Sequence, residues 1–139
     1  MREEPVVASV AYTAVCENCG AQLECWGTQA LVAGVLRWDV ESACAACGQA
    51  TATCGHDVPH QLRDRLLADL GPTTLHLADT PARVVLMRVL RAQLGTDLAN
   101  IAALTHRVLD GTYTGTLPEV EHLARTLRMA GIAAVAGGR

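Results

Sequence analysis

The amino-acid sequence predicts an α+β protein with two domains joined by a short helix. Strand-forming residues surround two cysteine motifs in the first half, which predicts a β-rich N-terminal domain. In the second half, apolar residues at helical spacing alternate with short extended segments, which predicts a β-α-α-(β)-α-β domain. The formal charge also differs, at −5 for residues 1–72 and +2 for residues 73–139, consistent with the net charge of −3. We expect the first domain over residues 1–57, the connecting helix over 58–72 and the second domain over 73–139.

The composition is that of a globular protein, because 50% of the 139 residues are hydrophobic and 18% are charged. No apolar run approaches the roughly 18 residues of a membrane helix, and the N-terminus has no apolar signal segment. All 11 basic residues are Arg, which is typical of a GC-rich bacterial genome. We expect a cytoplasmic protein that meets no membrane. In that reducing compartment, the 6 cysteines indicate metal binding or chemistry before disulfides.

The strongest functional signal is a pair of Cys-x2-Cys-Gly motifs separated by 24 residues, which contain Cys16 and Cys19, and Cys44 and Cys47. This spacing turns both thiols toward one ion, and the following glycine relieves crowding where backbone amides approach a sulfur. Two such motifs supply four thiolates, which favour Zn²⁺ in a closed tetrahedral shell. The four cysteines resemble the motif of the zinc ribbon class, and the resemblance covers little else. It implies a structural zinc site with no open position for a catalytic water.

Segments of strand-like composition flank the motifs as a ribbon requires, and they are residues 6–15, 21–28, 36–43 and 49–54. Residues 30–36 are apolar with a central glycine, and they form either a strand or the tip of a hairpin. Three interpretations stay open for Cys25, Cys54, His56 and His60: small buried thiols beside ordinary surface histidines, a second metal site, or a redox pair. A thioredoxin-like role does not suit either Cys-x2-Cys motif, because that redox motif stands alone in a chain.

The connecting helix is predicted from an apolar face between clear start and stop signals. Asp57 is the expected N-cap, with Pro59 just inside the helix, and Gly71-Pro72 ends it. A short helix with so apolar a face must pack on something, so we expect it to join the two domains rigidly. The apolar face consists of Leu62, Leu66, Leu67 and Leu70.

The second domain is expected to place a layer of helices on one face of a small antiparallel sheet. Pro81 is expected at the first position of its first helix and Gly95 at the end, and Thr116 to Glu119 has the spacing of a capping box. The expected elements are a strand over 73–78, a helix over 81–94, a helix from Thr96 or Asp97 to Val108, an extended piece over 113–115, a helix that Gly131 ends, and a strand over 132–136. The residues expected in its core are Leu86, Val89, Leu90, Leu94, Leu98, Ile101, Ala102, Leu104, Val108, Leu123 and Leu127.

A second stripe on the first of these helices mixes apolar and cationic side chains. Val84, Met87, Arg88 and Arg91 follow one another at i, i+3, i+4 and i+7. Two interpretations stay open, a solvated helix edge along which long side chains pack, or a surface that binds a partner. As a surface, it would suit a protein partner with an acidic, partly apolar face, because Arg pairs with carboxylates through two hydrogen bonds.

Landmarks in this half suggest a family. A patterned helix from Arg83 to Arg91 is followed by Gly95 and Leu98, and a later helix ends at Gly131 before a strand that contains valine. This order resembles the C-terminal domain of the bacterial ribosomal stalk protein over about residues 73–137. The resemblance implies the β-α-α-β-α-β fold and a first helix pair that recruits translation GTPases. The chain differs from the family in residues 99–102, where Ala-Asn-Ile-Ala replaces a Lys-Glu-Ala-Lys run, and a zinc ribbon stands in place of the family's dimerising region and hinge. The partner-contacting positions that the resemblance implies are Arg83, Val84, Met87, Arg88 and Arg91.

These observations predict a non-catalytic protein-interaction module, in which the stalk-like domain binds a protein and the ribbon provides a platform or a second contact. The alternative is a nucleic-acid-associated zinc-ribbon regulator. Charge disfavours nucleic acid, because the first half carries −5 before metal, and four thiolates with one Zn²⁺ add about −2. No activating carboxylate or oxyanion device accompanies Cys25 or Cys54, so the sequence predicts neither an enzyme nor a small-molecule substrate.

Overall fold

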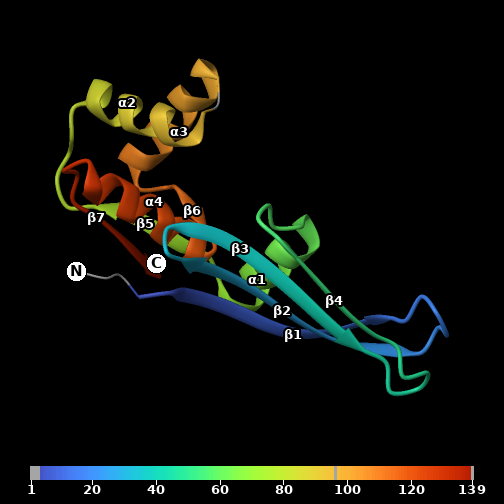
Figure 1. Ribbon diagram of the computed structural model, residues 1–139. Helices are drawn as coiled ribbons and strands as arrows, with labels where there is room; N and C mark the ends of the chain where they lie inside the picture. The colour runs from blue at the N-terminus through green and yellow to red at the C-terminus, as the bar shows by residue number, and fades with distance from the viewer. Residues whose placement is uncertain (1–3, 96, 139) are drawn as a thin grey trace. The chain divides into compact units, whose positions relative to one another are not determined.

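The protein is described here by a computed structural model that covers residues 4–95 and 97–138 (Figure 1). It is a mixed α+β structure with a four-stranded sheet, a second sheet of three strands and four helices in the described residues, as the sequence predicts. Two compact units divide the chain, Met1–Gly71 and Pro72–Arg139. Among the described residues, none of the helices combines the length and the apolar character that crossing a membrane requires.

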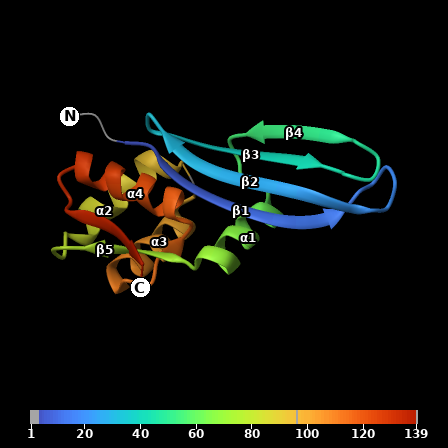
Figure 2. The same cartoon turned by 90° about the horizontal axis from the view of Figure 1, so that it is seen from below.

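The first unit is built on an antiparallel sheet whose strands pair in the order of the chain (Figure 2). The hairpin between the second and third strands has only Ala33 and Gly34 at its tip, with φ of +52° and +78°. Positive φ at both positions matches the right-handed twist of the flanking strands, so the apolar segment 30–36 is the tip of a hairpin. The strands are β1 (Val6–Val15), β2 (Gln22–Val32), β3 (Val35–Ala43) and β4 (Ala50–Gly55).

Helix α1 (His60–Leu70) belongs to the first unit, where it packs against β1. Its buried Leu62 and Leu66 meet Ala8 and Val10 of the strand. In the neighbouring strand β2, Gly27 leaves room for the end of the Leu62 side chain, which a Cβ at position 27 would overlap.

The predicted start of α1 and part of its apolar face are wrong. Pro59 is the N-cap, in an extended conformation with ψ of 144°, so the helix begins after the proline and Asp57 does not cap it. Leu70 is 57% exposed, because it lies in the last turn, where Gly71 ends the helix. The apolar face that meets the sheet is therefore shorter than the sequence pattern suggests.

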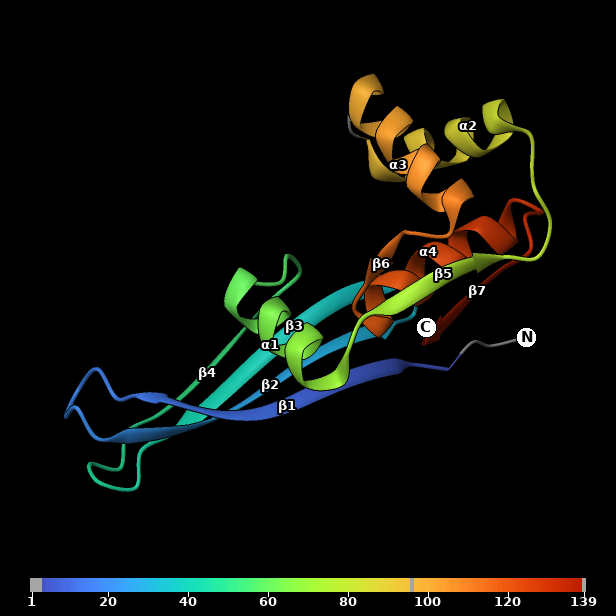
Figure 3. The same ribbon diagram turned by 180° about the vertical axis from the view of Figure 1, so that it is seen from behind.

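The second unit has the predicted β-α-α-β-α-β order, and its helices lie on one side of the sheet (Figure 3). The central strand of the sheet is β5 (Thr73–Leu77), the first strand of this unit. It pairs antiparallel with β6 (Thr114–Gly115) on one side and with β7 (Ala134–Gly138) on the other. The core gathers Leu75 from the sheet with Leu86, Ile101 and Leu127 from the three helices. The elements are β5 (Thr73–Leu77), α2 (Arg83–Leu94), α3 (Leu98–Asp110), β6 (Thr114–Gly115), α4 (Leu117–Met129) and β7 (Ala134–Gly138).

Local capping sets the starts of two helices in this unit. The predicted capping box is confirmed, since the Thr116 hydroxyl accepts from the Glu119 N–H at 3.3 Å and the Glu119 carboxylate accepts from the Thr116 N–H at 3.1 Å. Asp97 caps α3 by accepting from the Asn100 N–H at 2.8 Å. The alternative start at Thr96 lies outside the described residues.

Three predictions for the α2–α3 region are wrong. Helix α2 begins at Arg83 with Ala82 as its N-cap, so Pro81 precedes the helix and is not its first residue. Leu94 and Leu98, which the pattern assigned to the core, are 49% and 57% exposed. Both residues flank the turn at which α2 ends and α3 begins. The apolar spacing continues through this turn in the sequence, but the two side chains there do not face the core.

We expect a fragment of residues 72–139 to fold without the first unit, because its buried side chains come from its own three helices and its own sheet. A fragment of residues 1–71 should fold only when metal is supplied, since its apolar core is small. Two-dimensional NMR spectra of both fragments, recorded with and without zinc, test this. A fragment 72–139 that gives a collapsed spectrum would show that α1 is part of its core.

Candidate metal centre

Two hairpin tips bring the four cysteines of the paired motifs together. Residues 16–21 connect β1 to β2, and residues 44–49 connect β3 to β4. Because the strands follow one another antiparallel, both connections lie at the same end of the sheet (Figure 3). The 24 residues between Cys19 and Cys44 are thus Gly20 and Ala21, then β2, the two-residue turn and β3.

Both connections have the same backbone hydrogen bonds. The N–H of Gly20 donates to the Cys16 carbonyl at 2.7 Å, and the N–H of Gly48 donates to the Cys44 carbonyl at 2.8 Å. In addition, the first cysteine of each connection donates its N–H at 2.8 Å to the carbonyl of the residue five positions later. Each glycine has φ of +78°, a left-handed conformation that favours glycine over any other residue. The glycine after each Cys-x2-Cys therefore closes the turn that directs both sulfurs inward.

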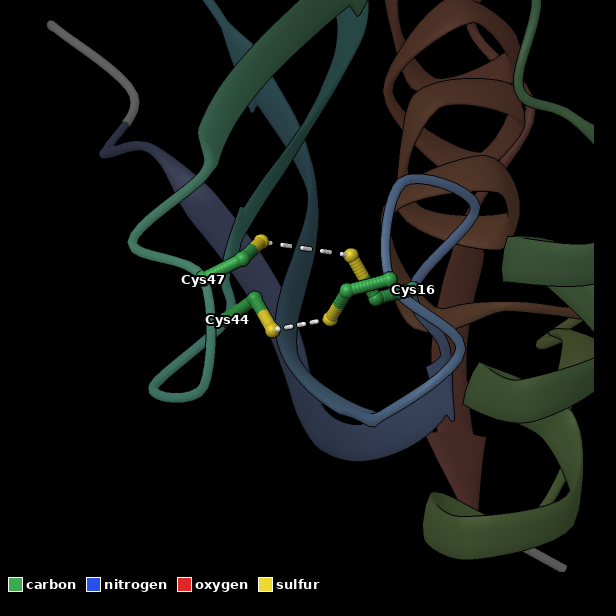
Figure 4. Close-up of side chains that lie close together, drawn as sticks. Cys16, Cys44 and Cys47 are labelled. Carbon is green, nitrogen blue, oxygen red and sulfur yellow. Dashed lines mark hydrogen bonds between the residues drawn. The ribbon is translucent and has the colours of Figure 1, made fainter.

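The sulfur atoms have the spacing of a tetrahedral metal site. All four lie within 4.8 Å of one another. The Cys16 and Cys47 sulfurs are 3.8 Å apart and those of Cys19 and Cys44 are 3.6 Å apart (Figure 4). A tetrahedron with metal–sulfur bonds of about 2.3 Å has edges of about 3.8 Å, whereas a disulfide would bring two sulfurs to about 2.05 Å. All four thiols are free, so the cluster can bind a metal ion.

The cluster is half shielded from water. Cys16 and Cys44, which begin the connections, are buried, and Cys19 and Cys47 are exposed. The Asn18 side chain and the Gln49 backbone N–H hydrogen-bond Cys47 and lower its pKa to about 6. The Ala21 backbone N–H acts in the same direction on Cys19, but the neighbouring sulfurs, Cys44 first, outweigh it and raise the pKa of Cys19 to about 12. Several thiolates can coexist at these distances only if a cation lies between them.

The donor set fits a closed structural site. Four sulfur ligands in tetrahedral arrangement are typical of Zn²⁺ or of iron–sulfur centres, and they leave no coordination position for substrate. Sequence reasoning missed Asn18, which lies in the first connection and hydrogen-bonds a cysteine of the second. Its position between two ligands was a visible signal, because Asn is a good donor in a turn.

The other cysteines and the two histidines do not form a second centre. Cys25 lies opposite Ser42 in β3 and Cys54 lies opposite Asp39, so β3 separates the two thiols and they lie on opposite faces of the sheet. Cys25 is buried, and this burial raises its pKa, while Cys54 is exposed. Among the described residues, the four-cysteine cluster is the only group suited to a metal. The second metal site and the redox pair are therefore wrong as interpretations, and the small buried thiol describes Cys25 alone.

The cationic stripe of α2 lies on the surface. Val84 is 64% exposed, Met87 is partly buried against the core, and all three arginines of the implied contact set, Arg83, Arg88 and Arg91, are exposed. None of these three guanidinium groups pairs with a carboxylate of residues 4–95 or 97–138.

Comparisons with known proteins give no relative. A scan against protein-family models, a search of curated proteins and a search of solved structures each found no match.

We expect one metal ion per chain, lost in the variants Cys16→Ser and Cys44→Ser. Removal of one thiolate opens a closed shell and leaves three sulfurs in mutual repulsion, so thermal stability of the first unit should fall together with metal content. Elemental analysis and thermal denaturation of each variant measure the two effects. Cys54→Ser is the matched control, since Cys54 is exposed and outside the cluster. Full metal content in Cys16→Ser, or its loss in Cys54→Ser, would contradict the assignment of ligands.

Proposed function

We propose that the chain is a non-catalytic protein-interaction module. Its first unit is a ribbon stabilised by one structural Zn²⁺ on Cys16, Cys19, Cys44 and Cys47. Its second unit binds, through α2, a protein with an acidic and partly apolar face. The resemblance to the ribosomal stalk domain indicates a translation GTPase, or another protein of translation, as this partner. A reducing cytoplasm suits this function, because it keeps the four thiols available to metal.

One observation carries the proposal for the second unit: α2 exposes branched apolar side chains among arginines that pair with no carboxylate of the described residues. Val84 and Val85 are 64% and 40% exposed, and Arg88 and Arg91 follow on the same helix. Folding gains nothing from leaving valine in water, whereas a partner that covers it gains both apolar contact and charge-assisted hydrogen bonds. Leu94 at the end of α2 and Leu98 at the start of α3 are exposed as well.

The stalk resemblance gains support from the order of elements. The second unit has the β-α-α-β-α-β order and the one-sided helix layer that the resemblance requires. In α3, Ala99 to Ala102 supplies no cation, and the exposed Arg107 lies in the last turn of the helix, so the positive charge of a GTPase contact would come mainly from α2. We therefore expect a narrower cationic contact than in the stalk family.

The alternative, a nucleic-acid regulator, lacks a basic surface on the ribbon. The first 72 residues carry a formal charge of −5, and binding of Zn²⁺ by four thiolates adds about −2. Phosphates are repelled by such a domain, so nucleic acid would have to bind through the arginines of the second unit. An enzyme is also disfavoured, because a closed sulfur shell provides no site for water or substrate.

We expect Arg88→Glu, and separately the pair Val84→Asp with Arg91→Glu, to weaken partner binding by at least about 2 kcal/mol, as for positions in the centre of an interface. The melting temperature should change little, because Val84, Arg88 and Arg91 are exposed. Calorimetric titration with a purified bacterial elongation-type translation GTPase measures the binding. NMR shift changes confined to α2 would locate the contact.

Arg37→Glu is the control for total charge, since Arg37 is exposed on β3 of the other unit and the substitution changes the net charge equally. Equal weakening by Arg37→Glu would indicate a non-specific electrostatic effect. A GTPase that binds neither the wild-type chain nor its variants would contradict the translation partner. Unfolding of Arg88→Glu would show that the stripe supports the core.

A further inference from the structure

Strand β1 is an edge of the first sheet, because it pairs with β2 and with no other strand of the described residues. Edge strands in natural proteins usually carry charged residues, prolines or bulges, which prevent pairing with another chain. The 10 residues of β1 have none of these protections: they include no charge and no proline, and the register with β2 advances one residue at a time. The opposite edge, β4, has only 6 residues.

Alternate residues of β1 direct their backbone groups to the free edge. The N–H of Cys16 donates to the Ala21 carbonyl at 2.8 Å, so the backbone of Cys16 faces β2. Successive residues of a strand point their backbone groups to opposite sides, so the odd-numbered residues face outward. Their side chains are all exposed, and they are Val7, Ser9, Ala11, Thr13 and Val15.

The sequence of β1 is nearly the same in both directions about Ala11. Val-Ala-Ser-Val precedes this residue and Tyr-Thr-Ala-Val follows it. An antiparallel second copy centred on Ala11 would therefore place Val opposite Val, Ala opposite Ala, Ser opposite Thr and Val opposite Tyr. Branched, hydroxyl and aromatic side chains in such pairs stabilise neighbouring strands, and no like charges meet. A second copy of β1 is thus a better match for this edge than a charged peptide.

We propose that two copies of the chain associate through β1, antiparallel about a twofold axis at Ala11, so that two four-stranded sheets become one. Each of the outward-facing residues exchanges two backbone hydrogen bonds with its opposite, which gives about ten in all. Val7 and Val15, now 54% and 71% exposed, cover each other across the interface. The pairing removes the unprotected edge of both copies.

On the face of the sheet that α1 covers, β1 borders a groove. This groove of about 430 Å³ lies between β1 and α1, lined by Tyr12, Thr13 and Ala14 of the strand and by Asp64 and Arg65 of the helix, among others. Arg65 lies over the Tyr12 ring at 4.9 Å and closes part of the groove. In the proposed register, Val10 of the partner subunit lies opposite Tyr12, and Ala8 of the partner subunit lies opposite Ala14. The added strand thus places one medium and one small apolar side chain beside the groove.

Sedimentation equilibrium of the zinc-loaded full chain tests the proposal, with a reversible dimer as the expected result. Ala11→Lys and Ala11→Glu each place two like charges opposite each other at the axis, and each should raise the dissociation constant at least about 100-fold. A mixture of the two variants should form a dimer again, because Lys then lies opposite Glu. Ala52→Lys is the matched control on the β4 edge, where it should leave the dimer unchanged.

A second variant covers the case in which a charge at position 11 disturbs folding. Thr13→Pro removes one outward N–H and blocks the approach of another strand, while an edge strand tolerates proline at such a position. It should leave a monomer with unchanged metal content. In the wild-type dimer, the amides of Ala11 and Thr13 should exchange hydrogen slowly, and in Thr13→Pro the amide of Ala11 should exchange fast. A wild-type chain that is monomeric at all concentrations, a dimer that survives Ala11→Lys, or a mixture that stays monomeric would overturn the proposal.

Discussion

The first unit depends on one constraint, which is that four sulfur atoms lie within 4.8 Å of one another at the tips of two hairpins. Thiolates at this spacing repel one another, so four of them are not stable together without a cation. A dication among them turns the repulsion into attraction and ties β1–β2 to β3–β4. The apolar core beneath the sheet, with Ala8, Val10, Leu62 and Leu66 as its buried members, is too small to order four strands by itself. Metal binding, which supplies on the order of 10 kcal/mol in zinc-finger peptides, can make up the difference.

Each of the two units leaves part of its surface exposed. In the first unit, β1 pairs with β2 alone among the described strands, and its other edge has no strand partner there. In the second unit, a core of its own orders the helices, with the Thr116 capping box fixing the start of α4. Helix α2 needs only Leu86 and Leu90 fully inside that core. Val84, Arg88 and Arg91 are exposed on this helix, while Met87 and Val89 pack partly against the core.

The features that the sequence predicts correctly are those that depend on a few residues close together in the chain. The Cys-x2-Cys-Gly spacing specifies a turn, and the capping box specifies a helix start, so both are confirmed at their residues. The relation between Cys25 and Cys54 depends instead on strand order and register. The meander inserts β3 between them, and the odd offset of their partners in β3 puts them on opposite faces, which no spacing of cysteines reveals. The apolar residues of α1 likewise predict a buried helix face, but they do not predict which of the two units the helix packs against. Helical periodicity also overestimated the core at Leu94 and Leu98, because a stripe continues through a helix end even where packing stops.

X-ray absorption at the zinc edge of the purified full chain decides whether the cysteine cluster is a closed zinc site that orders the first unit. We expect one zinc per chain with four sulfur neighbours at about 2.3 Å and no nitrogen or oxygen bound to the metal. A shell with fewer than four sulfurs, or with an oxygen from water, would contradict a closed structural centre. A folded chain without zinc or any other bound metal would contradict the dependence of the first unit on the metal.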